Sequence, residues 1–278
     1  MGSGSWTRAS FVNYTMDKGL VFDEINNLTS AKSVQDNFKA RDITSDLNPL
    51  NVMRECRDTE EHPNTKPVIL ALDVTGSMGS AATEIARSLN RVMEEIMSKD
   101  KDVEFCIMGI GDLYCDYAPI QISQFESDIR IAEHMDKVFF EFGGGGNSYE
   151  SYTAAWYMGA RHTDLDCWKR GKKGIIITIG DETINPYLPK DTLQLATGDS
   201  LQANVETDEL YKEASEKFDI YHIFADHSNY TERYGTAEKS GFGKILPQGH
   251  FSVQKIDEIP SRIIEIVTSV GHSEGISW

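Results

Sequence analysis

An aspartate and two hydroxyl residues alternate directly after an apolar run of the chain. The run covers residues 68–72, and the polar residues that follow it are Asp73, Thr75 and Ser77. Carboxylate and hydroxyl oxygens are hard ligands of the kind that magnesium and calcium prefer. The spacing therefore predicts a metal-binding loop.

The neighbouring elements would place this loop at the end of a strand. An unbroken apolar run of this length predicts a strand buried on both faces of a parallel sheet. Residues 80–99 then predict an amphipathic helix, because apolar positions recur there every three or four residues. In open α/β sheets, ligands bind in the crevice outside the carboxyl ends of the strands. The loop is thus expected at such a crevice.

Two later stretches of the chain offer similar chemistry. Four glycines at 143–146 are followed by Asn147, and Asp181 follows a second apolar run at 174–180. Glycine lets the backbone approach a bound ion closely, and an amide oxygen can coordinate a hard cation without adding charge. Three distant stretches of sequence therefore supply oxygen ligands.

In this combination the chain resembles the von Willebrand factor A family, and within it a bacterial and protist intracellular subtype. The loop from Asp73 to Ser77 resembles the metal-ion-dependent adhesion site of that family, whose usual form is Asp-x-Ser-x-Ser. The stretch 142–150 is similar to the form Gly-Gly-Gly-Asp-x-Pro-Glu, with Asn147 where that form has aspartate. Asp181 follows a later strand, as the third segment of the family does. The resemblance covers roughly residues 66–270.

The resemblance implies a ligand set and a role for the ion. Thr75, Ser77 and Asn147 would contact the metal, with Asp73 and Asp181 often acting through water. Mg²⁺ is the expected ion, and Mn²⁺ or Ca²⁺ would also suit these oxygens. Hydroxyls and an amide leave the ion under-neutralised, so a carboxylate from a partner protein can complete its coordination. The metal would then be an adhesive element and the chain a non-enzymatic binding domain.

The resemblance also indicates a class of partner. Many intracellular members of the family assist AAA+ ATPases, so such an ATPase is the first partner expected for this chain. That expectation follows from family analogy alone.

The order of the predicted elements indicates one α/β domain. Strands and helices alternate, which predicts a doubly wound, mostly parallel, Rossmann-like sheet of about six strands with helices on both faces. We expect this domain over residues 67–271, a largely irregular N-terminal arm over 1–66 and a tail over 272–278. The arm is expected to pack on the domain, or on a partner, through its aromatic residues Trp6, Phe11, Tyr14, Phe22 and Phe38.

The remaining elements can be placed from apolar periodicity. Strands are expected over 103–110, 118–122, 137–142, 174–180, 219–225 and 250–253. Helices are expected over 124–135, 149–161, 206–217, 230–239 and 256–270. Residues 182–203 contain two prolines and a glycine, so they predict a long connection at the rim of the crevice.

Composition and charge limit the classes of function that this chain can have. The chain has 278 residues, of which 40% are hydrophobic and 26% charged, as in a globular domain. Its formal charge of −17 disfavours a nucleic-acid surface, which needs clustered Lys and Arg. The basic stretch 169–173 is expected to be a solvated loop.

We expect no membrane segment and a cytoplasmic location. No apolar run approaches the roughly 18 residues needed to cross a bilayer, and the start of the sequence lacks the pattern of a secretory leader. The four cysteines form no Cys-x-x-Cys pair, which fits a reducing compartment.

Two other functions stay open. The stretch from Asp73 to Ser77 also looks like the phosphorylated loop of haloacid-dehalogenase-type enzymes, in which a strand-end aspartate attacks phosphorus with the help of magnesium. That alternative, an aspartyl-phosphate phosphohydrolase, expects a second acid at position 185, where this chain has Asn185. The other alternative is a structural domain whose metal loop is vestigial.

Individual acids also have simpler interpretations. Asp73 and Asp181 could be helix-cap or turn residues. Asp112 and Asp116 would be surface turn residues or would add negative potential at the crevice. Glu150 is expected in the first turn of its helix, where acids are favoured, with direct metal contact as the alternative.

Overall fold

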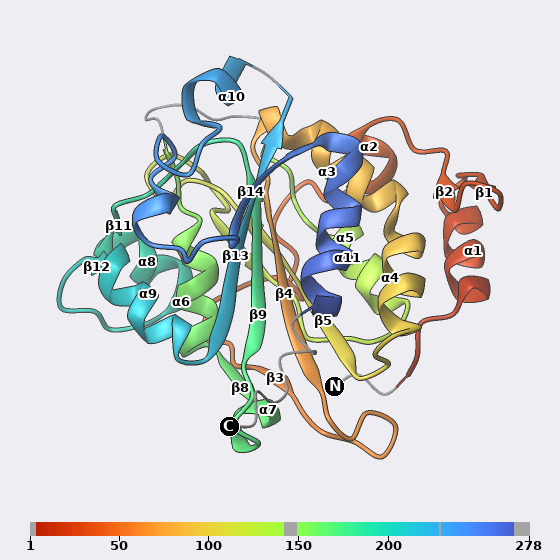
Figure 1. Cartoon of the computed structure of the whole chain (residues 1–278), viewed down its shortest axis with the longest axis horizontal. Coiled ribbons are helices and arrows are strands. Elements are labelled where there is room, and N and C mark those ends of the chain that lie inside the picture. The colour runs from red at the N-terminus through yellow and green to blue at the C-terminus, as the bar shows by residue number, and fades with distance from the viewer. Residues whose placement is uncertain (1–3, 142–148, 228, 270–278) are drawn as a thin grey trace.

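A six-stranded sheet forms the centre of the molecule (Figure 1). The computed structural model describes residues 4–141, 149–227 and 229–269. The strand order is β14-β13-β9-β4-β5-β6. These strands are β4 (Lys66–Asp73), β5 (Val103–Ile110), β6 (Ile120–Ile122), β9 (Gly174–Gly180), β13 (Phe218–Asp226) and β14 (Phe251–Lys255). All neighbours are parallel except β5 and β6, which confirms the predicted doubly wound, mostly parallel sheet.

Helices cover both faces of this sheet (Figure 1). One face carries α3 (Gly79–Arg87), α4 (Leu89–Met97), α5 (Arg130–Asp136) and α11 (Ile259–Ser269). The other carries α6 (Thr153–Arg161), α8 (Lys190–Thr197) and α9 (Thr207–Ser215). None of the described helices is long and apolar enough to cross a bilayer.

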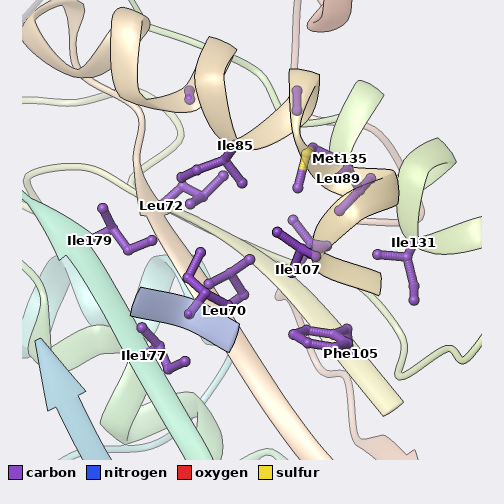
Figure 2. Packing of buried hydrophobic residues seen from close by; sticks show 14 of the residues in the cluster. Leu70, Leu72, Ile85, Leu89, Phe105, Ile107, Ile131, Met135, Ile177 and Ile179 are labelled. Atoms are coloured by element: carbon purple, nitrogen blue, oxygen red, sulfur yellow. The ribbon is translucent and has the colours of Figure 1, made fainter. Parts of the chain in front are cut away.

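The central strand β4 is apolar from Pro67 to Leu72 because it is buried on both faces. Val68, Leu70 and Leu72 belong to one hydrophobic cluster, whereas Ile69 and Ala71 belong to the other. Figure 2 shows the first cluster, where sheet residues meet side chains of the covering helices: Leu70, Leu72, Phe105, Ile107, Ile177 and Ile179 from the sheet, and Ile85, Leu89, Ile131 and Met135 from helices. Burial of these side chains fixes the sheet between its two helical layers.

The strand order reverses between β4 and β9. From β4 the chain adds β5 and β6 toward one edge, and from β9 it adds β13 and β14 toward the other. The ladder between β4 and β9 ends at the pair Leu72 and Ile179, so the carboxyl ends of both strands lie side by side. Such a reversal opens a crevice at the carboxyl edge, which is where ligands bind in sheets of this kind.

The N-terminal segment is more regular than expected. It contains α1 (Arg8–Asp17), the antiparallel pair β1 (Phe22–Asp23) and β2 (Leu28–Thr29), the short α2 (Val34–Asn37) and β3 (Arg54–Cys56). Thr7 caps α1, because its Oγ1 accepts a hydrogen bond of 3.1 Å from Ser10 N. β3 pairs with β8 (Thr163–Leu165), which ties the segment to the rest of the chain.

The aromatic residues of this segment pack on the domain as expected. Trp6, Phe11, Phe22 and Phe38 are buried in the same cluster as α3, α4 and α5, and Tyr14 packs against that cluster. The division of the chain at residue 66 stays a prediction. The proposed tail, 272–278, lies outside the described residues.

On the face of the sheet that carries α5, three predicted elements differ from the observed ones. The helix over 80–99 is interrupted at Ser88, between α3 and α4. The helix over 124–135 begins only at Arg130, because Glu126 and Phe105 exchange backbone hydrogen bonds of 2.8 and 2.9 Å. Residues 138–141 form no strand, since the side chain of Gln121 bonds the N–H and the C=O of Phe139 at 2.8 and 2.9 Å.

The observed elements also differ from the predicted ones in residues 149–161, 182–203 and 230–239. The predicted helix 149–161 starts with the short strand β7 (Tyr149–Glu150), which pairs with β10 (Thr183–Ile184). The expected connection 182–203 contains β10, β11 (Tyr187–Leu188) and helix α8, and β11 pairs with β12 (Val205–Glu206). Gly198 ends α8 with a positive φ of 84°, a conformation that favours glycine. The expected helix 230–239 is observed as α10 (Asn229–Tyr234).

Candidate metal centre

Asp73 and Asp181 lie at the carboxyl ends of the two strands that flank the reversal. Asp73 is the last residue of β4, and Asp181 directly follows β9. Both side chains are buried, with exposed fractions of 1% and 0%. Two buried carboxylates on adjacent strand ends need hydrogen bonds or a cation to offset their lost hydration.

Hydrogen bonds engage both carboxylate oxygens of Asp73. Its Oδ1 accepts bonds from Thr75 N at 2.9 Å and from Thr75 Oγ1 at 2.6 Å. Its Oδ2 accepts a bond of 2.9 Å from the hydroxyl of Tyr152. Asp73 is therefore held in one orientation by three donors.

Ser77 connects this group to Asp181. Ser77 Oγ donates to Asp181 Oδ1 at 3.2 Å and lies 3.3 Å from Thr75 Oγ1. Asp181 Oδ2 lies 3.1 Å from His227 Nε2, an ion pair when the histidine is protonated. Within the described part of the chain, this buried Oδ2 accepts no hydrogen bond of good geometry. The oxygen thus has capacity left for a cation.

The structure brings together four of the five predicted ligands: Asp73, Thr75, Ser77 and Asp181. The fifth, Asn147, lies outside the described residues. Among the residues that are described, no group of three or more His, Cys, Asp or Glu side chains is arranged to hold a metal. The candidate centre combines two carboxylates with two hydroxyls, which is an oxygen set suited to a hard cation.

The centre has an excess of negative charge. Burial and the nearby Asp181 raise the pKa of Asp73 to about 7. Burial and Asp73 raise the pKa of Glu150 to about 10, and burial and Asp181 raise the pKa of Glu182 to about 7. Like charges in a buried site oppose one another's ionisation, and a divalent cation would relieve that repulsion. The donor set and its electrostatics both fit a hard metal ion.

A histidine meets the centre at the end of β13. The Asp181 carboxylate raises the pKa of His227, which follows β13. The sequence pattern did not indicate a role for this histidine, because no second histidine stands at a spacing that would share its face. Its position just beyond the end of a strand of the central sheet was the available signal.

Tyr152 is the other contributor that sequence reasoning missed. Its side chain is fully buried, and its hydroxyl also accepts a bond of 3.2 Å from Glu182 N. Burial and the Asp73 carboxylate raise the pKa of Tyr152, so the phenol stays protonated and can donate. In the sequence, Tyr152 is part of an apolar helix face, which gave no sign of a contact with the strand-end aspartate.

Other acids near the centre have local roles. Glu150 lies in β7 and not in the first turn of the helix, and within the described residues its buried Oε2 has no hydrogen-bond partner. Asp112 accepts a bond of 3.0 Å from Tyr114 N, and Asp116 accepts one of 2.7 Å from Asp112 N, so both stabilise their own turn. They also add negative potential, because both raise the pKa of Glu150.

Asn185 stabilises the neighbouring backbone. It is 1% exposed, and its Oδ1 accepts a bond of 3.2 Å from Thr153 N. Its Nδ2 donates to Thr153 Oγ1 at 2.6 Å and to Tyr187 O at 3.1 Å. The two bonds to Thr153 join the β10–β11 segment to the start of α6, and the bond to Tyr187 closes the segment on itself, so Asn185 has a structural function.

Comparisons with known proteins find similarity in structure and none in sequence. No protein-family model matches the chain, and no curated protein matches it. The pilus adhesin SpaC from Lactobacillus rhamnosus GG, in its open conformation, is similar with a TM-score of 0.50 at 12% identity, over 77% of this chain. This chain spans 31% of the length of SpaC.

Two further solved structures are similar at lower TM-scores. The vWF domain of the type V pili tip protein Mfa5 from Porphyromonas gingivalis has a TM-score of 0.44 at 11% identity, over 77% of this chain and 98% of that one. BatB from Bacteroides thetaiotaomicron, a conserved hypothetical protein, has a TM-score of 0.46 at 14% identity, over 75% of this chain and 100% of that one.

At these identities, similarity in structure concerns the fold alone. The sheet has its strand order reversed between β4 and β9, one antiparallel edge strand and helices on both faces. The chain therefore has a doubly wound, Rossmann-like α/β fold, and its similarity to SpaC concerns that fold alone.

Proposed function

We propose that this chain binds a partner protein through a divalent cation, with Mg²⁺ as the expected ion. The ion would be held by Asp73, Thr75, Ser77 and Asp181, and by Asn147 from outside the described residues. The observation that carries this proposal is the continuous set of oxygen contacts from Asp73 through Thr75 and Ser77 to Asp181 at the strand reversal. When bound, the ion would offer a coordination position to a carboxylate of the partner.

Two observations favour binding over phosphoryl-transfer chemistry. A nucleophilic aspartate needs an accessible carboxylate oxygen, whereas Asp73 is 1% exposed and both of its oxygens accept hydrogen bonds. Asn185, at the place of the second acid, is occupied in structural hydrogen bonds. These contacts support a non-enzymatic role.

The charges favour a working centre over a vestigial one. Without a cation, the loop would keep the carboxyl groups of Asp73 and Asp181 buried together at a cost in folding free energy. Burial and the Asp181 carboxylate raise the pKa of Asp73, which shows that its ionised form is disfavoured there. A purely structural role would be served as well by neutral side chains. The retained carboxylates therefore support metal binding.

The partner is proposed to be a protein with an exposed acidic side chain, and an AAA+ ATPase is the first candidate. A nucleic-acid or membrane partner is not part of the proposal, given the net charge of −17. We also propose a cytoplasmic location. All four cysteines are free thiols, three of them buried, which supports a reducing compartment.

The test is a Mg²⁺ and Mn²⁺ titration by calorimetry, followed by capture of an acidic partner with and without chelator. Ser77→Ala is expected to abolish ion binding and partner capture. Ser80→Ala, at an exposed position of α3, is expected to leave ion binding and partner capture unchanged. A wild-type chain that binds neither ion at millimolar concentration would contradict the proposal. Binding of beryllium fluoride or aluminium fluoride together with Mg²⁺ would instead favour the phosphohydrolase.

A further inference from the structure

We infer that Tyr152 is a positioning residue of the metal centre, whose hydroxyl holds the Asp73 carboxylate and the backbone after Asp181 in one fixed arrangement. This inference rests on the proposed function. It assigns a role to a side chain that is not among the predicted ligands and that touches the ion only through Asp73.

The hydroxyl of Tyr152 makes two contacts on opposite sides of the strand reversal. It donates to Asp73 Oδ2 at 2.9 Å, at the end of β4, and accepts from Glu182 N at 3.2 Å, after β9. The ladder between these strands ends at the pair Leu72 and Ile179, one residue before Asp73 on β4 and three residues before Glu182 beyond β9. The hydroxyl therefore continues the connection between the two strand ends at the level of the ligands.

The surrounding packing fixes the ring of Tyr152. The ring meets His222 edge-on at 5.0 Å between centroids and lies 6.0 Å from Phe242. The backbone of Gly180 leaves the space that the hydroxyl needs, since a Cβ at that position would lie 2.0 Å from the hydroxyl oxygen. A buried phenol with a fixed ring and two bonded partners can orient a carboxylate without any reorganisation when a cation binds.

The direction of the bond explains how Tyr152 would act. Because it donates to Oδ2 and Thr75 donates to Oδ1, the carboxylate of Asp73 cannot rotate without losing a bond. Partners that orient a ligand in this way commonly change metal affinity by about 10- to 100-fold when they are removed. The same range is expected for the loss of this hydroxyl.

Tyr152→Phe is the direct test, because it removes the hydroxyl and keeps the ring. Mg²⁺ affinity by calorimetry, and Mn²⁺ affinity by the electron paramagnetic resonance signal of the free ion, are expected to fall roughly tenfold or more. Tyr157→Phe is the matched control: Tyr157 is also buried, lies on α6, which follows Tyr152 directly, and donates to the Asp199 carboxylate. The control is expected to keep the wild-type metal affinity.

The outcomes separate this inference from the proposed function. A wild-type chain that binds no divalent ion overturns both. Wild-type binding with an equal affinity in Tyr152→Phe overturns the role of Tyr152 and leaves the proposed function standing. A weaker metal affinity of Tyr152→Phe beside an unchanged metal affinity of Tyr157→Phe supports the role of Tyr152. The folding control is the thermal midpoint of each variant, which should be the same in chelator and in buffer without added metal.

A second measurement needs no variant and covers the case in which Tyr152→Phe fails to fold. A hydroxyl proton that is buried and bonded to a carboxylate exchanges slowly and can be observed by nuclear magnetic resonance in the wild-type chain. Its signal is expected to shift when Mg²⁺ is added, because the acceptor carboxylate then faces a cation. A Tyr152 hydroxyl signal that stays unchanged while Mg²⁺ binds would overturn the inference.

Discussion

Ser77 Oγ donates a hydrogen bond of 3.2 Å to Asp181 Oδ1, although the two residues lie 104 positions apart in the sequence. Ser77 belongs to the turn after β4, and Asp181 follows β9, so the bond joins the two strand ends between which the sheet reverses its order. Through Thr75 the same set of contacts reaches Asp73. A cation bound there would meet oxygens from both halves of the sheet.

Removing the charge of Asp181 should stabilise the protein in chelator, and it should remove the stabilisation that Mg²⁺ gives. Asp181→Asn is expected to raise the free energy of unfolding in chelator by about 1 kcal/mol, because burial and, after it, the Asp181 carboxylate raise the pKa of Asp73 to about 7. In millimolar Mg²⁺ the variant should lose the stabilisation that the metal gives to the wild type. Urea denaturation at pH 8, with and without Mg²⁺, measures both effects.

The control for this change is Glu61→Gln, which removes one charge from an exposed position of the loop before β4. It should alter neither the stability in chelator nor the effect of Mg²⁺. An equal Mg²⁺ stabilisation in the wild type and in Asp181→Asn would count against Asp181 as a ligand.

The hydroxyl of Thr75 provides a second test of the ligand set. Thr75→Ser keeps the hydroxyl that donates to Asp73 at 2.6 Å, so its Mg²⁺ affinity should stay near that of the wild type. Thr75→Val keeps the shape and loses the oxygen, and its affinity should fall by roughly tenfold or more. Calorimetric titration compares the two, and a Val variant that binds as tightly as the Ser variant would exclude Thr75 from the centre.

The central strands and the place of Asp73 and Asp181 at the carboxyl edge of the sheet could be predicted because they depend on local pattern. β4 and β9 are buried on both faces, so each is a continuous apolar run, and the polar residue that ends each run lies at the carboxyl edge of the sheet. The contacts among Asp73, Thr75 and Ser77 follow from their spacing in one turn.

Other features depend on side chains that are distant in sequence. Residues 138–141 have an apolar pattern but form no strand, because the side chain of Gln121 satisfies the backbone of Phe139. Tyr152 contacts Asp73 across 79 positions, and its place in the apolar pattern of the predicted helix 149–161 gave no sign of that polar contact. Helix α1 has no continuous apolar stripe, so its cap at Thr7 and its packing through Phe11 were not visible as a helix signal.

That packing makes the N-terminal segment part of the stability of the domain. Phe11 is 3% exposed, and its ring lies 5.4 Å from that of Trp6 and 5.9 Å from that of Phe22. Phe11→Ala should lower the free energy of unfolding by about 3 kcal/mol, because it leaves a cavity between α1 and the covering helices. Val21→Ala, at a position that is 68% exposed, should change it by less than about 0.5 kcal/mol.

Urea denaturation of the two variants measures this difference, and Mg²⁺ titration of Phe11→Ala adds an independent readout. The metal affinity should stay at the wild-type value, since α1 packs on the helices and not at the carboxyl edge of the sheet. Equal stability of the two variants would show that the segment is not anchored through Phe11.

A buried acid on β5, outside the candidate metal centre, should give the protein a distinct pH dependence. Glu104 of β5 is 0% exposed, and its Oε2 accepts a bond of 3.1 Å from the Cys56 thiol. Burial raises the pKa of Glu104 from 4.5 to about 7. Because the folded-state pKa lies above the unfolded value, the stabilising contribution of the protonated acid is complete below about pH 4.5 and is lost as the pH rises through about 7.

Glu104→Gln replaces this acid with a neutral side chain of the same shape. At pH 8 it should raise the free energy of unfolding by about 1–3 kcal/mol relative to the wild type, and at pH 4.5 the two should differ much less. Urea denaturation at half-unit steps from pH 4.5 to 8 measures the difference, which removes the contributions of other titrating groups that both proteins share. The free energy of unfolding of Glu61→Gln should follow that of the wild type over the whole pH range. If the free energy of unfolding of Glu104→Gln also follows that of the wild type, then Glu104 is ionised at its ordinary pKa in the folded protein.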